Sequence, residues 1–189
     1  MVKSAFQTDL GKNAANYQAL TPLHFLQRAA GVYPEHTAWI HGQDSVNYRE
    51  FGLRCRRLGS ALAQRGIGVG DTVAVMAPNV PALLEAHYGV PMVGAVLNAI
   101  NVRLDASMIA FILKHGEAKL LITDREYSCT ISDALAAMDD PPPVIDIDDP
   151  IYEGSGDLLG DVDYESFLAE GDPTFRASGP NDEWNAITL

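Results

Sequence analysis

The sequence predicts an α/β fold, a parallel sheet with helices on both faces. Between about residues 72 and 123, apolar segments alternate between strand-like and helix-like patterns. The strand-like segments are nearly continuous apolar runs, which is typical of strands covered on both sides. The links between segments are short, and short links in a β-α-β order favour parallel strands joined by right-handed crossovers.

The first expected element is a helix that begins after Thr21-Pro22. Threonine is a good capping residue, and proline is tolerated in the first turn because its missing N–H would have no partner there. Apolar residues recur at helical spacing from Leu23 to Ala30. The helix is expected to end near Tyr33-Pro34.

Two short strands and a long helix should follow. Residues 38–41 and 45–46 have strand character, with Gly42 in the turn between them. A helix is then expected from Asn47 to about residue 64, closed by Gly66 in the left-handed conformation.

This helix carries several charged residues. Asn47 and Glu50 have the spacing of a capping box. Arg54, Arg56 and Arg57 are interpreted as a solvated face, with Glu50 and Arg54 paired one turn apart. No aromatic residues are interleaved with these arginines, so a nucleic-acid interface is not expected.

The centre of the chain supplies the predicted sheet. We expect strands at 72–76, 95–99 and 119–123, with helices from about 80 to 93 and from 106 to 116. Asn79 and Asp105 are the expected caps of these two helices. Pro91 should bend or end the first of them.

The pattern weakens after Asp124. A helix near 131–138, a strand at 144–147, a loop at 148–160 and one or two helical turns at 163–169 are expected. Residues 133–189 hold one basic residue, Arg176, against 15 acidic residues, whereas the formal net charge of the whole chain is −12. We therefore divide the chain into an α/β core at 17–124 and an acidic, loop-rich surface excursion at 139–183. Such a segment repels nucleic acid and anionic lipid.

Composition excludes several classes of protein. The 189 residues are 47% apolar and 20% charged, which is globular rather than disordered. Cys55 and Cys129 are far apart and lack a CxxC partner, so neither a disulfide framework nor a zinc site is expected. The first residues lack the apolar core of a secretory signal. Residues 80–100 are apolar but include Glu85 and Pro91, so no membrane span is expected, and the predicted location is cytoplasmic.

Motifs for phosphate or catalytic chemistry are weak. The glycines at 66–70 precede a strand instead of following one, and those at 154–160 miss the dinucleotide spacing by one residue. Both are interpreted as turns. His87 is interpreted as a packed, hydrogen-bonded side chain, with a catalytic role as the alternative. No catalytic residue, metal site or bound cofactor is expected within this chain.

The carboxyl ends of the strands are the place where an open parallel sheet binds ligands. Asn79, Asn101 and Arg103 follow two of these strands and are the candidate contacts with a substrate or a neighbouring subdomain. The alternative is that they cap helices and brace loops.

Four segments together resemble the AMP-forming acyl-CoA synthetases, a family of adenylate-forming ligases. They are Leu20–Ala30, Gly70–Pro81, Gly94–Leu104 and Asp182–Leu189. The resemblance implies that residues 1–189 are the N-terminal part of an AMP-binding (adenylation) domain. It also implies an incomplete large domain, with the C-terminal remainder absent.

The resemblance implies an activity as well. Such enzymes adenylate a carboxylic acid with Mg-ATP, release pyrophosphate and pass the acyl group to coenzyme A. Their phosphate-binding loop follows the strand that resembles residues 186–189. The carboxylic acid, ATP, Mg and coenzyme A are therefore expected for the complete enzyme, and the chain alone is expected to be inactive.

Two further hypotheses remain open. One is a non-catalytic interaction module that self-associates or docks through an uncovered sheet edge. The other is an independent flavodoxin-like nucleotide-binding domain.

Overall fold

The computed structural model describes residues 11, 13, 15–17 and 20–177. Within them the helices and strands are α1 (Pro22–Val32), β1 (Thr37–His41), β2 (Asp44–Asn47), α2 (Tyr48–Gln64), β3 (Thr72–Met76), α3 (Pro81–Met92), β4 (Val96–Ala99), α4 (Ala106–His115), β5 (Ala118–Asp124), α5 (Ser128–Ala136), β6 (Val144–Ile147), β7 (Val162–Asp163) and α6 (Tyr164–Ala169). The strand expected at residues 186–189 lies outside the described residues.

The predicted parallel sheet is confirmed. Among the described residues, five strands form it in the order β4-β3-β5-β6-β7, and every pair is parallel. Strand β3 lies between β4 and β5 in the sheet. Helix α3 forms the crossover from β3 to β4, and α4 forms the crossover from β4 to β5. Because the strands are parallel, their carboxyl ends all lie at one edge of the sheet.

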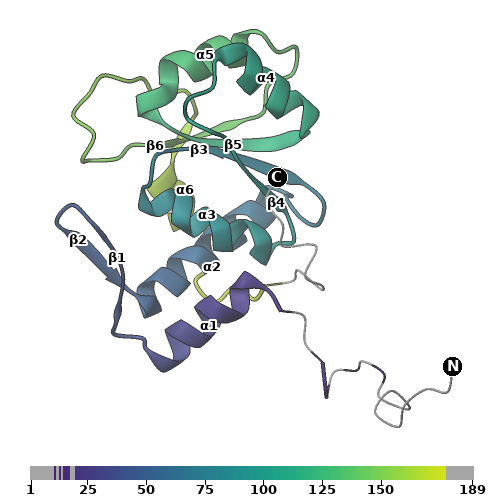
Figure 1. The fold of residues 1–189 in the computed structure, drawn as a ribbon, viewed down its shortest axis with the longest axis vertical. Coiled ribbons are helices and arrows are strands. Elements are labelled where there is room, and N and C mark those ends of the chain that lie inside the picture. The colour runs from purple at the N-terminus through teal and green to yellow at the C-terminus, as the bar shows by residue number, and fades with distance from the viewer. Residues whose placement is uncertain (1–10, 12, 14, 18–19, 178–189) are drawn as a thin grey trace, which may run out of the picture.

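The two faces of the sheet are covered by different helices (Figure 1). Helices α4 and α5 lie on one face, and α3, α2 and α6 lie on the other, with α1 beyond them. The alternation along β3 explains the division, because Val73 and Val75 face the α2–α3–α6 side while Ala74 and Met76 face α4 and α5. Both faces are thus packed by apolar side chains, as the continuous apolar strands predicted.

The helix caps were predicted with mixed success. Asn47 accepts a hydrogen bond from Glu50 N, and Asp105 accepts one from Met108 N, both at 2.9 Å. Thr21 is the residue before α1, but its side chain makes no capping hydrogen bond. The expected cap at Asn79 is wrong by one residue, because Val80 precedes α3 and Pro81 occupies the first turn. Proline in the first turn removes one N–H that a cap would otherwise satisfy.

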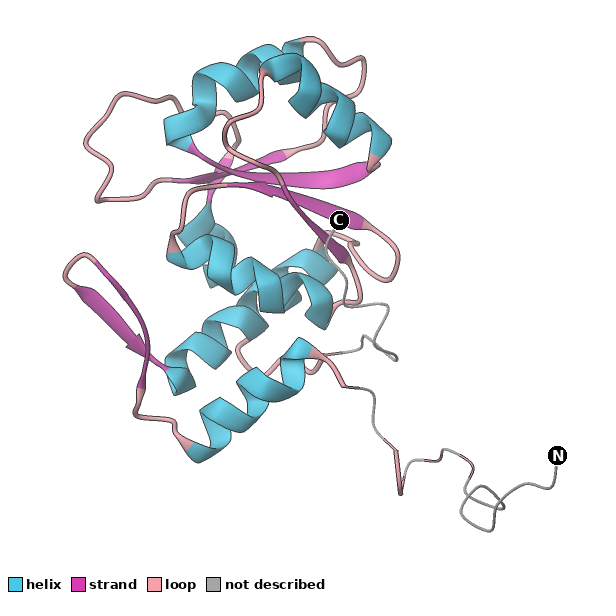
Figure 2. Cartoon of the chain, viewed as in Figure 1, coloured by secondary structure: helices cyan, strands magenta, loops and turns pink. Residues whose placement is uncertain are grey.

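Strands β1 and β2 form an antiparallel hairpin beside the main layers (Figure 2). Gly42 in its turn has a φ of 60°, which glycine adopts without strain. An added Cβ at Gly42 would lie 2.5 Å from Ile151 Cδ1, so the tip of the hairpin touches the loop that follows β6.

The acidic segment does more than cover the surface. Strands β6 and β7 extend the sheet, and Tyr164, Phe167 and Leu168 of α6 belong to the main apolar cluster. The core of the fold therefore continues past residue 124. The connection between β6 and β7 has the loop character that was expected of residues 148–160.

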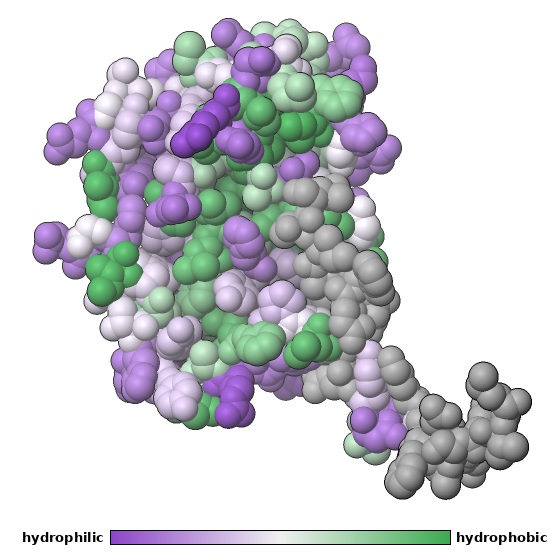
Figure 3. Space-filling model, viewed as in Figure 1, coloured by the Kyte–Doolittle hydropathy of each residue, from purple (hydrophilic) through white to green (hydrophobic). Residues whose placement is uncertain are grey.

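Figure 3 shows one face of the molecule in space-filling form. Apolar side chains gather in its middle, over the sheet and α3, and polar side chains surround them. None of the described helices is long and apolar enough to cross a membrane.

Candidate functional site

The carboxyl edge of the sheet collects polar residues from four strands. Going across the sheet from β4 to β6, this edge carries Asn101 and Arg103, then Asn79, then Asp124, and finally Asp148 with Asp149. The candidate contacts chosen from the sequence, Asn79, Asn101 and Arg103, follow β3 and β4. The order of strands in the sheet, which the sequence did not reveal, decides which of these groups are neighbours.

Asn101 and Arg103 lie together in an exposed loop. Asn101 Oδ1 accepts a hydrogen bond from Arg103 N at 3.0 Å, and Asn101 O accepts one from Leu104 N. Asn101 therefore braces the loop, as the alternative interpretation held. The guanidinium of Arg103 is exposed and has no ion pair within the described part of the chain.

Asn79 faces a different neighbour. It lines a cavity of about 290 Å³ with Trp39, His41 and His87, between the hairpin and the start of α3. The predicted histidine contact is only half right, because His87 Nδ1 lies 2.8 Å from Leu83 O but its side chain is exposed rather than packed. The three candidate residues thus share one edge of the sheet, with Asn79 turned toward the hairpin.

A larger cavity adjoins this one. It measures about 450 Å³ and shares Trp39, His41, Val80 and Pro81 with the smaller cavity. Its remaining lining comes from β2, α2, α3, the end of β6 with the residues after it, the end of β7 and the start of α6: Asp44, Ser45, Val46, Arg54, Ala82, Ile147, Asp148, Asp149, Pro150, Asp163, Tyr164 and Glu165. The hairpin forms one wall of this cavity.

His41 closes the cavity toward the loop after β6. Its Nε2 lies 3.0 Å from both carboxylate oxygens of Asp149, which is largely buried. The two residues are 108 positions apart. No local sequence pattern connects residues at that separation, so sequence reasoning missed this pair.

An ionic network with a buried centre and one exposed carboxylate forms another wall. Arg54 Nε donates to Glu85 Oε1 at 2.5 Å, and Arg54 Nη2 donates to Glu165 Oε1 at 2.5 Å. The Tyr164 hydroxyl donates to Glu85 Oε2 at 2.9 Å. This network, which we call the α2–α3–α6 lock, corrects two expectations. The Arg54 side chain is only 17% exposed, and Glu50 pairs with Arg57 instead of Arg54.

The ionisation of the lock follows from its burial. Burial raises the pKa of the Glu85 carboxyl, and the hydrogen bonds and charge of Arg54 oppose that shift. Burial alone would lower the pKa of the Arg54 guanidinium, but its hydrogen bonds to Glu165 and Glu85 raise it. Arg54 therefore remains charged, and it is shared between two carboxylates.

Asp124 is the central acid of the edge. Its side chain is buried, Oδ1 accepts from Glu126 N at 2.9 Å, and Oδ2 has no hydrogen-bond partner among the described residues. Burial raises the pKa of this carboxyl, and the negative charge of Asp149 raises it further. This carboxyl therefore ionises less readily than an exposed aspartate.

The charges decide which ligands this part of the edge favours. Five carboxylates line the larger cavity, and three of them are paired: Asp148 with Arg125, Asp149 with His41 and Glu165 with Arg54. Such a lining repels phosphate and carboxylate groups. Arg125, whose Nε lies 2.6 Å from Asp148 Oδ1, is already paired. The β6 end of the edge therefore carries more carboxylates than cations, whereas the exposed Arg103 at the β4 end carries a positive charge.

The glycine clusters fit the expectation that they are turns. Gly66 and Gly70 have φ angles of 77° and 86° and lie between α2 and β3. At Gly160 an added Cβ would lie 2.1 Å from Val144 O, so this glycine allows the chain to pass close to β6. Within the described residues, no group of three or more His, Cys, Asp or Glu side chains is arranged to hold a metal ion.

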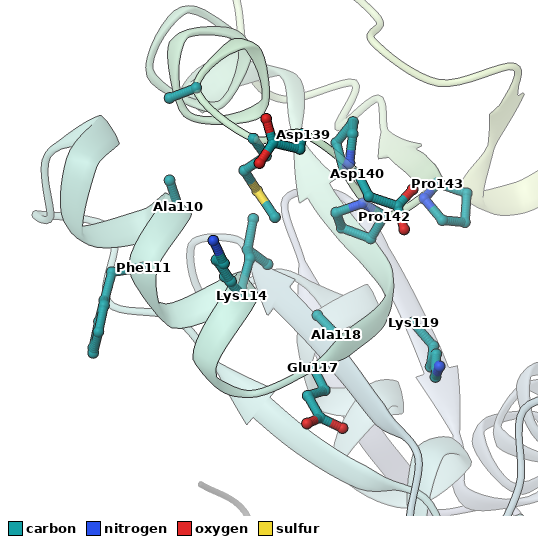
Figure 4. Close-up of a pocket in the computed structure, with 14 residues that line it drawn as sticks. Ala110, Phe111, Lys114, Glu117, Ala118, Lys119, Asp139, Asp140, Pro142 and Pro143 are labelled. Atoms are coloured by element: carbon teal, nitrogen blue, oxygen red, sulfur yellow. The ribbon is translucent and has the colours of Figure 1, made fainter.

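The opposite edge of the sheet also has a hollow (Figure 4). A cavity of about 580 Å³ lies where β5 begins, between the end of α4 and residues 137–143. Lys114 and Asp139 enter it from opposite walls, and the ring of Phe111 points away. Ligands of open parallel sheets sit at the carboxyl ends of the strands, so this amino-edge cavity is not the candidate site.

Comparison with curated proteins gives close relatives of this chain. An acetate/butyrate–CoA ligase of Arabidopsis thaliana is 46% identical to it over 192 residues, which cover 96% of this chain and 34% of the relative. An acetate–CoA ligase of Humulus lupulus is also 46% identical, with the same coverage. The chain thus spans about a third of the length of these relatives.

Solved structures confirm the fold. An anthranilate CoA ligase in complex with anthranoyl-AMP matches 92% of this chain and 32% of that protein, with a TM-score of 0.77 and 18% identity. A benzoate CoA ligase from Burkholderia xenovorans LB400 matches 85% of this chain and 30% of that protein, with a TM-score of 0.73 and 21% identity. The parallel sheet with its helices is therefore the N-terminal part of the adenylate-forming ligase fold. The family profile described as AMP-binding enzyme matches residues 26–177, and this chain belongs to that family.

Proposed function

We propose that the chain is the N-terminal part of an ATP-dependent acyl-CoA synthetase. The complete enzyme would join a small carboxylic acid to ATP, release pyrophosphate, and transfer the acyl group from the adenylate to coenzyme A. The proposal is carried by the 46% identity to an acetate/butyrate–CoA ligase across 96% of this chain. Acetate and butyrate, named for that relative, are the first acids to test.

The described residues would serve this reaction as a scaffold and as one wall of the site. The acidic lining near β6 disfavours the phosphates of ATP, so we assign the grip on ATP and Mg to the remaining two thirds of such an enzyme. Adenylation requires the carboxylate to approach a phosphate although both are anions. A part of the protein that offers few cations near its cavity cannot supply that step alone.

Asn101 and Arg103 would act at the other end of the same edge. Arg103 has no ion pair among the described residues, and it presents an exposed positive charge after β4, three strands away from the carboxylates after β6. We propose that Arg103 meets an anionic group of a substrate or a polar group of the neighbouring subdomain, while Asn101 fixes the loop. Asn79, which faces the hairpin, would contact the subdomain rather than the substrate.

Strand β4 is the edge of the described sheet and pairs only with β3 there. We propose that this edge docks against the remainder of the enzyme, or against a second copy of the chain when the remainder is absent. A free strand edge offers unpaired backbone groups to such a partner. Size-exclusion chromatography of the isolated chain over a range of concentrations would detect the second copy.

The decisive experiment uses a chimera. This chain replaces the corresponding first third of the Arabidopsis acetate/butyrate–CoA ligase, and pyrophosphate release is measured with acetate, butyrate, Mg-ATP and coenzyme A. We expect activity from the chimera and none from the 189-residue chain alone. Turnover by the isolated chain would contradict the scaffold role. A well-folded chimera without activity would contradict the assignment to this reaction.

The same chimera tests Arg103. Arg103→Ala should lower kcat/KM about tenfold, on the order of a lost charge-assisted contact. Arg28→Ala, at an exposed arginine of α1, is the matched control and should leave kcat/KM unchanged. Equal kcat/KM values for the two variants would contradict the assignment of Arg103 to the site.

The cellular location is still a proposal. We propose the cytoplasm, although the Arabidopsis relative is described as peroxisomal. Fluorescent tagging of the chain in its own cells would decide between the two compartments.

A further inference from the structure

The β1–β2 hairpin stands apart from the layered core. Its strands are largely exposed or half-buried, and Ile40 near the tip is 72% exposed. An isolated two-stranded hairpin is only marginally stable in water. Its position must therefore be set by the few contacts that it makes with the rest of the molecule.

The base of the hairpin is anchored. Ala38, Trp39 and Val46 pack on the apolar cluster that joins α1, α2 and the end of α3. Backbone hydrogen bonds from Tyr48 N to His36 O at 2.9 Å and from Arg49 N to Pro34 O at 3.1 Å close the base. These contacts fix where the hairpin leaves the core, but they do not reach its tip.

Two contacts fasten the tip. His41 Nε2 is shared between the oxygens of Asp149, and Ile151 packs against the Gly42 backbone. Asp149 is itself held, because its Oδ1 also accepts from Ile151 N at 3.0 Å. One partly exposed histidine–aspartate contact and one aliphatic contact make a weak fastening compared with the packed base.

The cavity of about 450 Å³ lies beneath the fastened hairpin. Trp39 lines it, and the buried Trp39 Nε1 has no hydrogen-bond partner among the described residues. A buried N–H without a partner costs free energy in the closed state and can be hydrated when the cavity opens. The contacts of Asp149 and Ile151 thus stabilise the closed position of the hairpin, and the unpartnered Trp39 Nε1 destabilises it.

We propose that the β1–β2 hairpin is a strap, fastened by Asp149 and Ile151, that opens and closes the cavity beneath it. The strap turns about its packed base, so opening moves the tip while α2, α3 and the sheet stay in place. Carboxylates still outnumber cations in the lining of this cavity, although three of the five are paired, so the uncovered cavity would favour neutral or cationic groups over nucleotides. This inference is independent of the proposed activity.

The test uses Trp39 as a reporter in the full chain, with Trp184→Phe as the background because the sequence has 2 tryptophans. Acrylamide quenching of Trp39 fluorescence is compared between this background and the variants His41→Phe and Ile151→Ala. Each variant removes one fastening and keeps the other. We expect each to raise the quenching constant at least twofold.

Hydrogen–deuterium exchange on the same proteins locates the change. Exchange at residues 37–47 should rise about tenfold in both variants, while exchange in β3 and β5 stays as in the background. Glu35→Gln is the control, because its ion pair with Arg49 is exposed and lies at the base. Unchanged quenching and exchange in both variants would overturn the strap. A uniform rise throughout the chain would also overturn it, since that result means general destabilisation.

Discussion

The two faces of the sheet are held by different kinds of interaction. On the α4–α5 side, apolar residues such as Ile109, Leu113 and Ile131 make the contact. On the other side, a similar apolar layer is joined by the α2–α3–α6 lock, whose central Glu85 is fully buried. The first face is built from elements that follow one another in the chain. The lock joins residues 31 and 111 positions apart, so it links the late acidic segment to the early core alongside the apolar contacts of α6.

The largest expected effect breaks the lock. Arg54→Ala leaves Glu85 buried without its cation, and removing one partner of a buried pair typically costs about 3–5 kcal/mol. Urea unfolding followed by circular dichroism should show this loss of unfolding free energy. Arg57→Ala is the matched control, because its pair with Glu50 is long, at 3.6 Å, and half-exposed; it should cost about 0–1 kcal/mol. Equal losses for the two variants would mean that the lock is no stronger than a surface pair.

A substitution in the core of the α4–α5 face tests that face by the same urea unfolding measurement. Ile109 of α4 is fully buried among apolar residues. Ile109→Ala removes apolar contacts and leaves a cavity, at a typical cost of about 2–5 kcal/mol. Met108→Ala, one residue earlier and 45% exposed, should change stability little. If Ile109→Ala were as mild as Met108→Ala, the apolar face would not be a packed core.

The sequence predicted the apolar face better than the face that carries the lock. The apolar face depends on local patterns, and its cap at Asp105, its helix end at Gly116 and its strands were all predicted. The lock depends on tertiary contacts, and Arg54 looked like any helical surface arginine with Glu50 one turn earlier. Glu85 in an apolar helix was a signal that some cation had to reach it, because a buried charge requires a partner. The sequence alone did not identify that cation as Arg54.

In the candidate site, too, features that depend on local sequence were predicted and features that depend on distant contacts were missed. Asn79, Asn101 and Arg103 were placed at the carboxyl edge from the strand order along the chain, and the structure places them there. Their roles in catalysis or docking stay predictions. The cavity beneath the hairpin was missed, because it depends on His41 meeting Asp149 and on β6 joining the sheet beside β5. Both are contacts between distant parts of the chain.

A smaller expected effect is a difference between the two faces in how the free energy of unfolding depends on pH. Burial raises the pKa of Glu85 above its ordinary value of 4.5, so the folded state binds this proton more tightly than the unfolded chain does. The contribution of Glu85 is therefore greatest at low pH and declines as the pH rises from 4.5 through the folded-state pKa. Glu85→Gln removes this titration. The stability of the original chain relative to Glu85→Gln should decline over that window in urea titrations at a series of pH values.

The smallest effect has the opposite sign and belongs to the apolar face. Hydrogen bonds from the Ser107 hydroxyl and from Met108 N lower the pKa of Asp105, the exposed cap of α4. A carboxyl whose pKa is lower in the folded state stabilises the fold above its unfolded pKa, and this stabilisation is lost as the pH falls through the folded-state pKa. Asp105→Asn keeps a capping side chain but does not titrate. The original chain should therefore lose stability relative to Asp105→Asn on acidification, whereas against Glu85→Gln it should gain. If both differences moved in the same direction, the two carboxyls would not report the contrast between a buried lock and an exposed cap.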